Sequence, residues 1–201
     1  VESLDPDQPF FAVFNLTITH ESGTFPGTRR RPKVVDPLKV AVAPYWPDTP
    51  VVRTDIARTY DNIAAMDAKV GKLVEELKEA GLLETTIIFF FSDHGVGLPR
   101  GKRCIYDSGT RVPLVVCRPG GSPSVSHRPV SFVDFAPSVL SFAGIEAQPW
   151  MAGRAFAGPH KKPGTGLAFF HADRMDAEID HTRAVTDGRY RYVRNYMPEK
   201  P

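Results

Sequence analysis

The chain has 201 residues, of which 42% are hydrophobic, enough for one domain or one large part of a larger domain. Its 25 basic and 23 acidic residues nearly balance, so the net charge of +2 gives no reason to expect nucleic acid or an anionic membrane as partner. No apolar stretch approaches the about 18 residues of a membrane span, and the first residues lack the pattern of a signal peptide.

The N-terminal part of the sequence predicts a strand, a long surface segment and a helix. Pro9–Thr19 is mostly apolar and β-prone, which predicts a core strand that leads to His20. Residues 23–50 are dense in Pro, Gly and Arg, and such a long surface segment is a candidate wall of a substrate site. From 53 to 80, apolar residues recur every three or four positions, which predicts one amphipathic helix that stops at Gly81.

A continuous apolar run, Thr86–Phe91, follows this helix and stops just before the adjacent Asp93 and His94. The run predicts a strand that is buried on both faces, as is typical of a parallel sheet. Ligands of open α/β sheets bind outside the carboxyl ends of the strands, and a carboxylate and an imidazole can both bind a divalent cation. The alternative is a solvated turn that only caps the next segment.

The C-terminal half predicts further elements of both kinds. Residues 111–116 predict a strand, and residues 132–144 predict a helix with Pro137 in its first turn. Two β-prone segments follow, 167–171 and 182–196, and an Asp-Gly pair inside the second predicts a tight hairpin. Helices that alternate with buried strands indicate an α/β fold, with a mostly parallel central sheet flanked by helices.

The two cysteines match no zinc-ligand spacing and form one disulfide or none. Cys117 ends the apolar run Val112–Cys117, which favours a buried free thiol. Cys104 lies beside Lys102 and Arg103, which would lower a thiol pKa, but no general base is evident next to it. We therefore expect neither cysteine to take part in catalysis.

Four polar side chains lie at predicted strand ends or in the loops after them: His20, Asp93, His94 and Lys102. A cation held by Asp93 and His94 would polarise an oxyanion, while Lys102 and His20 would neutralise or protonate a leaving oxygen. This combination suits the transfer of sulfate or phosphate. The sequence contains none of the common nucleophile motifs. The alternative interpretation of His20 is a loop histidine that hydrogen-bonds the backbone.

Several motifs carry a family resemblance in their order along the chain. Ser92–Gly95 is followed, over Gly101–Pro113, by the pattern Gly-Lys-x-x-x-Tyr-x-x-Gly-x-Arg-x-Pro, with related helix segments at 60–67 and 132–138. Together they resemble the second half of a formylglycine-dependent sulfatase of the alkaline-phosphatase superfamily. Residues 189–196 are similar to heparan N-sulfatase-like members in particular.

The resemblance implies an alkaline-phosphatase-like fold and a sulfuric-ester hydrolase that acts on a sulfated carbohydrate or an aryl sulfate. It implies that Asp93 and His94 bind one divalent cation. Calcium is expected, with Mn²⁺ or Mg²⁺ as alternatives, because imidazole is a poorer calcium ligand than the Asn amide of many family members. Lys102 would contact the sulfate oxygens, and His20 would lie near the leaving-group oxygen.

The resemblance also points to a substrate-facing region near the C-terminus. It implies that His171, Asp173 and Arg174, expected in a loop after a strand, contact the substrate; an exposed polar loop is the alternative. The expected partner is a sulfated small molecule or glycan, with no nucleic acid and no membrane span, and the oligomeric state stays open. Because family members are mostly exported, the resemblance implies a periplasmic, extracellular or lysosomal protein.

The departures from the family pattern define what the chain is expected to lack. The formylglycine nucleophile is made within a Cys/Ser-x-Pro-x-Arg motif, which does not occur in this sequence, and the upstream pair of metal-binding aspartates is also missing. We expect residues 1–145 to form the C-terminal portion of the catalytic domain without its N-terminal third. Residues 146–201 would form a linker and the beginning of a smaller, β-rich C-terminal subdomain. Such a segment is expected to be inactive alone.

Two alternative functions remain open. One is a phosphonate monoester or phosphodiester hydrolase of the same superfamily. Such enzymes also use formylglycine and can carry the Asp-His pair that this chain has as Asp93 and His94. The other is a non-catalytic member that binds sulfated glycan without cleaving it.

Overall fold

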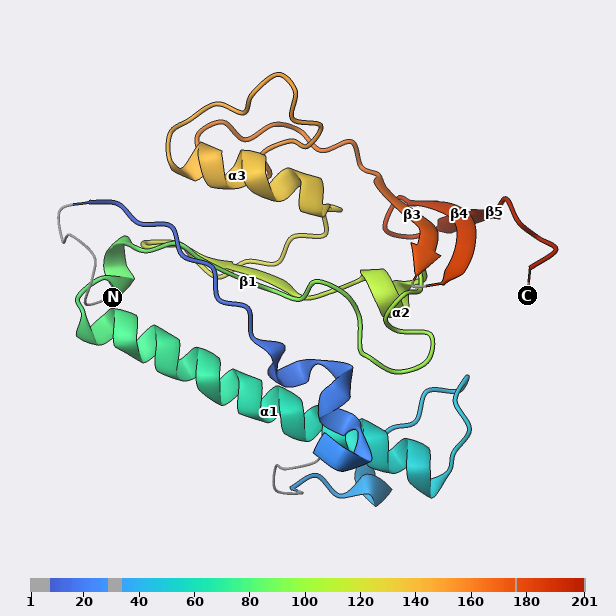
Figure 1. Ribbon diagram of the computed structural model, residues 1–201. Coiled ribbons are helices and arrows are strands. Elements are labelled where there is room, and N and C mark those ends of the chain that lie inside the picture. The colour runs from blue at the N-terminus through green and yellow to red at the C-terminus, as the bar shows by residue number, and fades with distance from the viewer. Residues whose placement is uncertain (1–7, 29–33, 176, 201) are drawn as a thin grey trace. The chain divides into compact units, whose positions relative to one another are not determined.

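The computed structural model describes residues 8–28, 34–175 and 177–200 (Figure 1). The chain divides into two compact units, one made of residues 1–102 and 106–122 and the other of residues 103–105 and 123–201. Over the described ranges, no helix has both the length and the apolar character needed to cross a bilayer.

Helix α1, Pro50–Glu79, is the longest element of the first unit (Figure 1). Pro50 occupies the first helical position, and the Thr49 side chain accepts a hydrogen bond from the Val52 N–H at 3.4 Å. Just beyond the helix, Gly81 has a φ of +69°, in the left-handed region that favours glycine. The predicted helix and its glycine stop are confirmed.

The buried face of α1 packs against the loop that contains Leu98 and Pro99. Ile56 and Ala57 of the helix form a core with Val40. Five partly buried apolar side chains pack against this core: Val35, Val42, Trp46, Val52 and Leu98. Trp46 also donates a hydrogen bond from Nε1 to the Pro99 carbonyl at 2.8 Å. Because Leu98 packs on the core and Pro99 is hydrogen-bonded to Trp46, this part of the loop is tied to the helix.

Strand β1, Ile88–Phe91, pairs with strand β2, Leu114–Cys117, in an antiparallel sheet of two strands. The expectation of a parallel, doubly buried strand is wrong for this pair, since β1 is only half-buried and Phe91 is 42% exposed. Parallel neighbours need a crossover connection, usually a helix, of a dozen or more residues. The connection between β1 and β2 contains only the four-residue helix α2, Asp107–Thr110.

The predicted strand Pro9–Thr19 is not a strand. Residues 9–16 have no regular secondary structure, and the chain then forms the 3-10 turns η1, Thr17–Thr19, and η2, Glu21–Thr24. Both turns contact α1 (Figure 1). Strand propensity depends on packing against a neighbouring strand, and none of the described strands pairs with this segment. Three other short turns of this part of the chain are η3, Pro26–Thr28, η4, Pro37–Lys39, and η5, Leu83–Thr85.

The second unit contains a helix whose serine hydroxyl groups bind the segment that follows it. The turn η6, Phe132–Asp134, leads into α3, Phe135–Phe142, which confirms the predicted helix with Pro137 in its first turn. The buried Ser138 and Ser141 accept backbone hydrogen bonds from Phe156 at 2.9 Å and from His160 at 2.8 Å. These bonds attach the following irregular segment to the helix.

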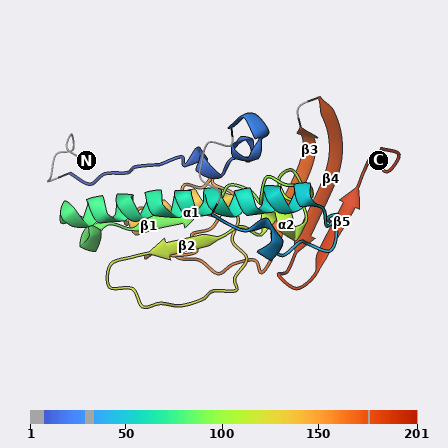
Figure 2. The same ribbon diagram turned by 90° about the horizontal axis from the view of Figure 1, so that it is seen from below.

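The second unit also contains a three-stranded antiparallel sheet in the order β3-β4-β5 (Figure 2). Its strands are β3, Ala168–Met175, β4, Glu178–Thr186, and β5, Arg191–Asn195. Asp187 Oδ1 accepts backbone hydrogen bonds from Arg189 and Tyr190, at 2.8 and 2.6 Å, and Gly188 has a φ of +90°. The predicted hairpin is confirmed.

Both cysteines are free thiols. Cys117 is exposed, so the expectation of a buried thiol is wrong. Successive side chains of a strand face opposite sides, and along β2 exposed residues alternate with half-buried ones, so Cys117 falls on the exposed side.

Candidate functional site

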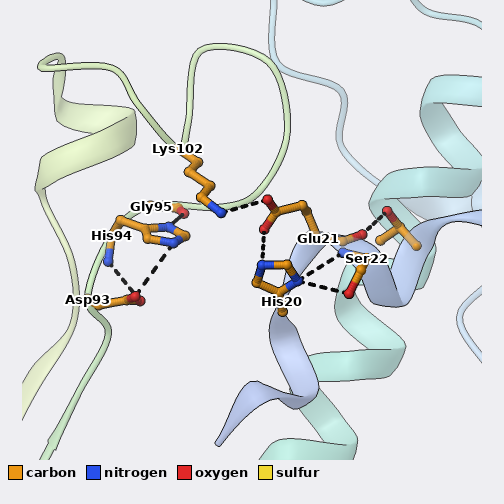
Figure 3. A network of polar contacts seen from close by, with 8 residues as sticks. His20, Glu21, Ser22, Asp93, His94, Gly95 and Lys102 are labelled. Carbon is orange, nitrogen blue, oxygen red and sulfur yellow. Dashed lines mark hydrogen bonds and ion pairs between the residues drawn. The ribbon is translucent and has the colours of Figure 1, made fainter. Parts of the chain in front are cut away.

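A short ion pair joins two predicted loops of the first unit. Lys102 Nζ lies 2.6 Å from Glu21 Oε1, although the residues are 81 positions apart in the sequence (Figure 3). Both side chains are largely buried, with 22% of Lys102 and 20% of Glu21 exposed, and a charged hydrogen bond is stronger there than in water. The hydrogen bond from Lys102 holds the pKa of Glu21 below its usual range, against the opposing effect of burial. Glu21 is therefore ionised at neutral pH.

His20 lies on the other side of the same carboxylate. Its Nε2 is 3.1 Å from Glu21 Oε2, and its Nδ1 accepts a hydrogen bond from the Ser22 N–H at 3.3 Å (Figure 3). Because Nδ1 is an acceptor, the imidazole proton lies on Nε2 and faces Glu21. This contact lacks hydrogen-bond geometry, and it is an ion pair only when the imidazole is protonated. Glu21 thus bridges the predicted sulfate-binding lysine and the predicted leaving-group histidine.

Replacing Glu21 by glutamine is expected to lower the free energy of unfolding of a full-length protein by about 1 kcal/mol at neutral pH. The folded pKa of Glu21 lies below the unfolded one. Its stabilising contribution is therefore complete above the unfolded pKa and is lost as the pH falls through the folded pKa. The difference between native protein and variant should be constant near neutrality and shrink in acid, as measured by denaturant unfolding over a pH series.

Glu76→Gln, on the exposed surface of α1, is the matched control and should leave stability nearly unchanged. A deficit in Glu21→Gln that stays the same from neutral to acid pH would contradict the assignment of the ion pair.

Asp93 and His94 lie in the loop directly after β1 (Figure 3). Asp93 Oδ1 accepts the His94 N–H at 3.1 Å, and His94 Nδ1 is 2.7 Å from the Gly95 carbonyl oxygen. A carbonyl oxygen can only accept, so Nδ1 carries a proton and Nε2 of the neutral ring has a free lone pair. A backbone contact of this kind fixes the tautomer of many metal-binding histidines.

The donor set of Asp93 and His94 fits part of a cation site. His94 Nε2 and Asp93 Oδ2 are 3.6 Å apart, and the Asp93 side chain is 83% exposed. Metal bonds of about 2.0–2.6 Å leave room for one cation between two acceptors at this separation. Among the described residues no third His, Cys, Asp or Glu completes a metal-binding group with them.

Close backbone contacts explain the glycines of the two motifs. Gly95 donates its N–H to the Gly109 carbonyl at 2.9 Å, and a Cβ at Gly95 would lie 1.9 Å from the Ser108 carbonyl oxygen. Only glycine allows this approach. Lys102 donates its N–H to the Val96 carbonyl at 2.8 Å, which closes the loop. The loop therefore holds Lys102 in a fixed place relative to the Asp93-His94 segment.

The structure places His171, Asp173 and Arg174 inside strand β3 of the second unit, so the expectation of a loop is wrong. The strand continues because its residues pair with β4, with His171 opposite Arg183, and a register shift between Ala172 and Arg174 leaves Asp173 without a Cα partner. Asp173 Oδ1 lies 2.6 Å from Arg183 Nη1, and this guanidinium holds the pKa of Asp173 below its usual range. The role of these three residues in substrate binding stays a prediction.

Glu21 is the site residue that sequence reasoning missed. It follows His20 directly, and an acidic residue next to a candidate catalytic histidine was the available signal. Its partner Lys102 is distant in the sequence, so only the folded chain shows the ion pair.

Comparisons with known proteins identify the family. The family model described as Sulfatase matches residues 2–145, well over half of the chain. The chain belongs to the sulfatase family. The ulvan-active sulfatase of Formosa agariphila is 40% identical to it, in a match that covers 96% of this chain and 39% of that protein. The human N-sulphoglucosamine sulphohydrolase is 38% identical over 57% of this chain and 23% of its own length.

The sulfatase fold is confirmed by similarity to a solved structure. The structure of BT4656 in complex with its substrate D-glucosamine-2-N,6-O-disulfate superimposes with a TM-score of 0.60 and 24% identity. The match covers 75% of this chain and 34% of that one. The predicted α/β, alkaline-phosphatase-like class is therefore correct, although the strand pair of this chain is antiparallel.

Two further facts bear on what this sulfatase chain can do. The match spans only 39% of the length of the ulvan-active sulfatase. Sulfatases are generally metal-dependent, which agrees with the chemistry of the Asp93 and His94 side chains.

Proposed function

We propose that a full-length protein containing this chain is a sulfuric-ester hydrolase that removes sulfate from a sulfated carbohydrate. The observation that supports this most is the bridge of Lys102 and His20 by one largely buried carboxylate, in a chain of the sulfatase family. The bridge brings an ammonium group and an imidazole N–H to one site. When the bond from sulfur to the leaving oxygen breaks, the ammonium can stabilise charge on the sulfuryl oxygens and the imidazole N–H can donate to the leaving oxygen.

Each of the three bridged residues has a distinct proposed role. Lys102 stabilises negative charge on the sulfuryl oxygens, because its largely buried ammonium is attracted to them more strongly than in water. His20 donates from Nε2 to the departing oxygen. Glu21 is a positioning residue, which keeps Lys102 and His20 oriented through its two oxygens.

Asp93 and His94 are proposed to supply two ligands of one divalent cation, which is Ca²⁺ with Mn²⁺ or Mg²⁺ as alternatives. When bound, the cation would act as a Lewis acid on a sulfuryl oxygen. The remaining ligands and the formylglycine nucleophile are proposed to come from protein outside this chain. In that arrangement, residues 1–145 belong to the catalytic domain and residues 146–201 begin a smaller subdomain.

The names of the relatives support a glycan substrate and export. One relative is named an ulvan-active sulfatase, another an N-sulphoglucosamine sulphohydrolase, and a solved structure contains a disulfated glucosamine. A further relative, from Drosophila melanogaster, is named an extracellular sulfatase homologue. We therefore propose an exported enzyme that acts on a sulfated sugar.

The test is a comparison of kcat/KM for one aryl alcohol esterified as sulfate, phosphate and phosphonate, with a full-length protein. The sulfate ester should be turned over with the highest kcat/KM, and the isolated 201-residue chain should turn over none of the three. A preference for phosphate or phosphonate would favour the related hydrolases. Binding of sulfated glycan with no turnover of any ester would favour a non-catalytic protein.

A further inference from the structure

The first unit has an open surface pocket of about 550 Å³, called the cavity below, which none of the proposed site residues lines. It is lined by two tyrosines, two arginines, an aspartate and a serine: Tyr45, Tyr106, Arg100, Arg111, Asp107 and Ser108. Two of its ionisable side chains are positive and one is negative, so the lining favours an anion. The aromatic rings add flat apolar surface, because Tyr45 is 45% exposed and Tyr106 is 47% exposed.

Aromatic rings hold the Arg100 guanidinium. Its Cζ lies 5.1 Å from the centre of the Tyr45 ring and 5.5 Å from the centre of the Tyr106 ring. Cation–π contacts orient a guanidinium but use none of its N–H groups as donors to an oxygen. Arg100 is thus positioned in the cavity wall with its hydrogen-bonding capacity available.

The two cavity arginines differ in their partners from Arg53, Arg58 and Arg183. Arg53 pairs with Asp48, Arg58 with Asp61, and Arg183 with Asp173: these are arginines held by carboxylates. Within residues 8–28, 34–175 and 177–200, no carboxylate forms an ion pair with Arg100 or Arg111. Planar guanidinium groups bind carboxylate and sulfate oxygens through paired hydrogen bonds.

The cavity wall and Lys102 lie on one loop, whose backbone is held by local contacts. Arg100 has a φ of +65°, a conformation that non-glycine residues seldom adopt, and its carbonyl accepts a hydrogen bond from the Ser108 hydroxyl. Gly101 donates its N–H to the Leu98 carbonyl at 2.9 Å. Arg100 is two residues before Lys102, so their Cα atoms are at most about 7 Å apart. Lys102 and one wall of the cavity therefore belong to the same loop.

We infer that this cavity is a subsite for an anionic sugar adjacent to the sulfate group that is cleaved. The tyrosine rings pack against the sugar ring, and Arg100 and Arg111 bind its sulfate or carboxylate group. The inference deepens the proposed function and rests on it, since it requires a sulfated glycan at Lys102. It specifies that the preferred substrate carries a second negative charge on a neighbouring sugar.

Equilibrium binding of heparin tetrasaccharide to a full-length protein, measured by calorimetry, tests the subsite without relying on turnover. Arg100→Ala should weaken binding by about tenfold or more. Arg100→Lys, which keeps the charge and the loop but loses the paired hydrogen bonds, should also weaken binding. Arg118→Ala is the matched control, because it removes the same charge from an exposed arginine outside the cavity lining.

Two results would overturn the subsite: no binding by the native protein, or an equal loss of affinity in Arg118→Ala and Arg100→Ala. A companion assay of aryl sulfate turnover by the native protein separates this inference from the proposed function. Tetrasaccharide binding that depends on Arg100, in a protein that turns over no sulfate ester, would support the subsite and reject the hydrolase.

Discussion

Replacing Lys102 by alanine in a full-length protein is expected to lower kcat for a sulfate ester by about 100- to 1,000-fold, the usual effect of removing one group that stabilises an oxyanion. The Lys102 side chain is only 22% exposed and its Nζ lies 2.6 Å from a carboxylate oxygen, so the ammonium is held in place before any substrate arrives. Steady-state kinetics with an aryl sulfate measures the loss, which should fall on kcat more than on KM.

The same change leaves the Glu21 carboxylate buried without its lysine, which costs about 1–3 kcal/mol of stability. The double variant Lys102→Ala with Glu21→Gln removes that unpaired charge and should recover part of the stability but none of the activity. Lys69→Ala, which removes an exposed lysine from α1, should behave as the native protein. Recovery of turnover in the double variant would show that Lys102 is structural.

The sequence predicted well those elements whose signals are local. The spacing of apolar residues along α1 and the glycine at position 81 act within a few turns of one helix. Likewise, the turn at Asp187 and Gly188 is stabilised locally, by hydrogen bonds from the Arg189 and Tyr190 N–H groups to the Asp187 carboxylate. Strand pairing was predicted poorly, because Pro9–Thr19 and β1 carry similar apolar patterns, and only one of them has a partner among the described strands.

The candidate site shows the same division between local and distant signals. His20, Asp93, His94 and Lys102 could be proposed as site residues because each lies in a short motif of the sequence. Glu21 was missed because its importance comes from a contact with Lys102, across a fold that brings η2 beside the loop after β1 (Figure 3). Such a contact depends on α1 and its core, to which both segments are attached.

Replacing Asp93 by alanine in a full-length protein is expected to reduce turnover by at least about 100-fold and to remove the bound divalent cation. The Asp93 side chain is 83% exposed, and its Oδ1 accepts a hydrogen bond from the N–H of its neighbour His94. Its loss should therefore change stability by no more than about 0.5 kcal/mol. Elemental analysis of the purified protein gives the metal content, and kinetics and thermal unfolding give the other two quantities.

The control for Asp93→Ala is Cys104→Ala, a half-buried free thiol outside the proposed site, which should leave the metal content and the turnover nearly intact. Loss of metal together with a native-like unfolding transition would separate a ligand from a residue needed for folding. A turnover or metal content of the native level in Asp93→Ala would show that the metal assignment is wrong. His94 Nε2 is the second proposed ligand atom, 3.6 Å from Asp93 Oδ2. His94→Ala should therefore weaken binding of the same cation, measured in the same assay.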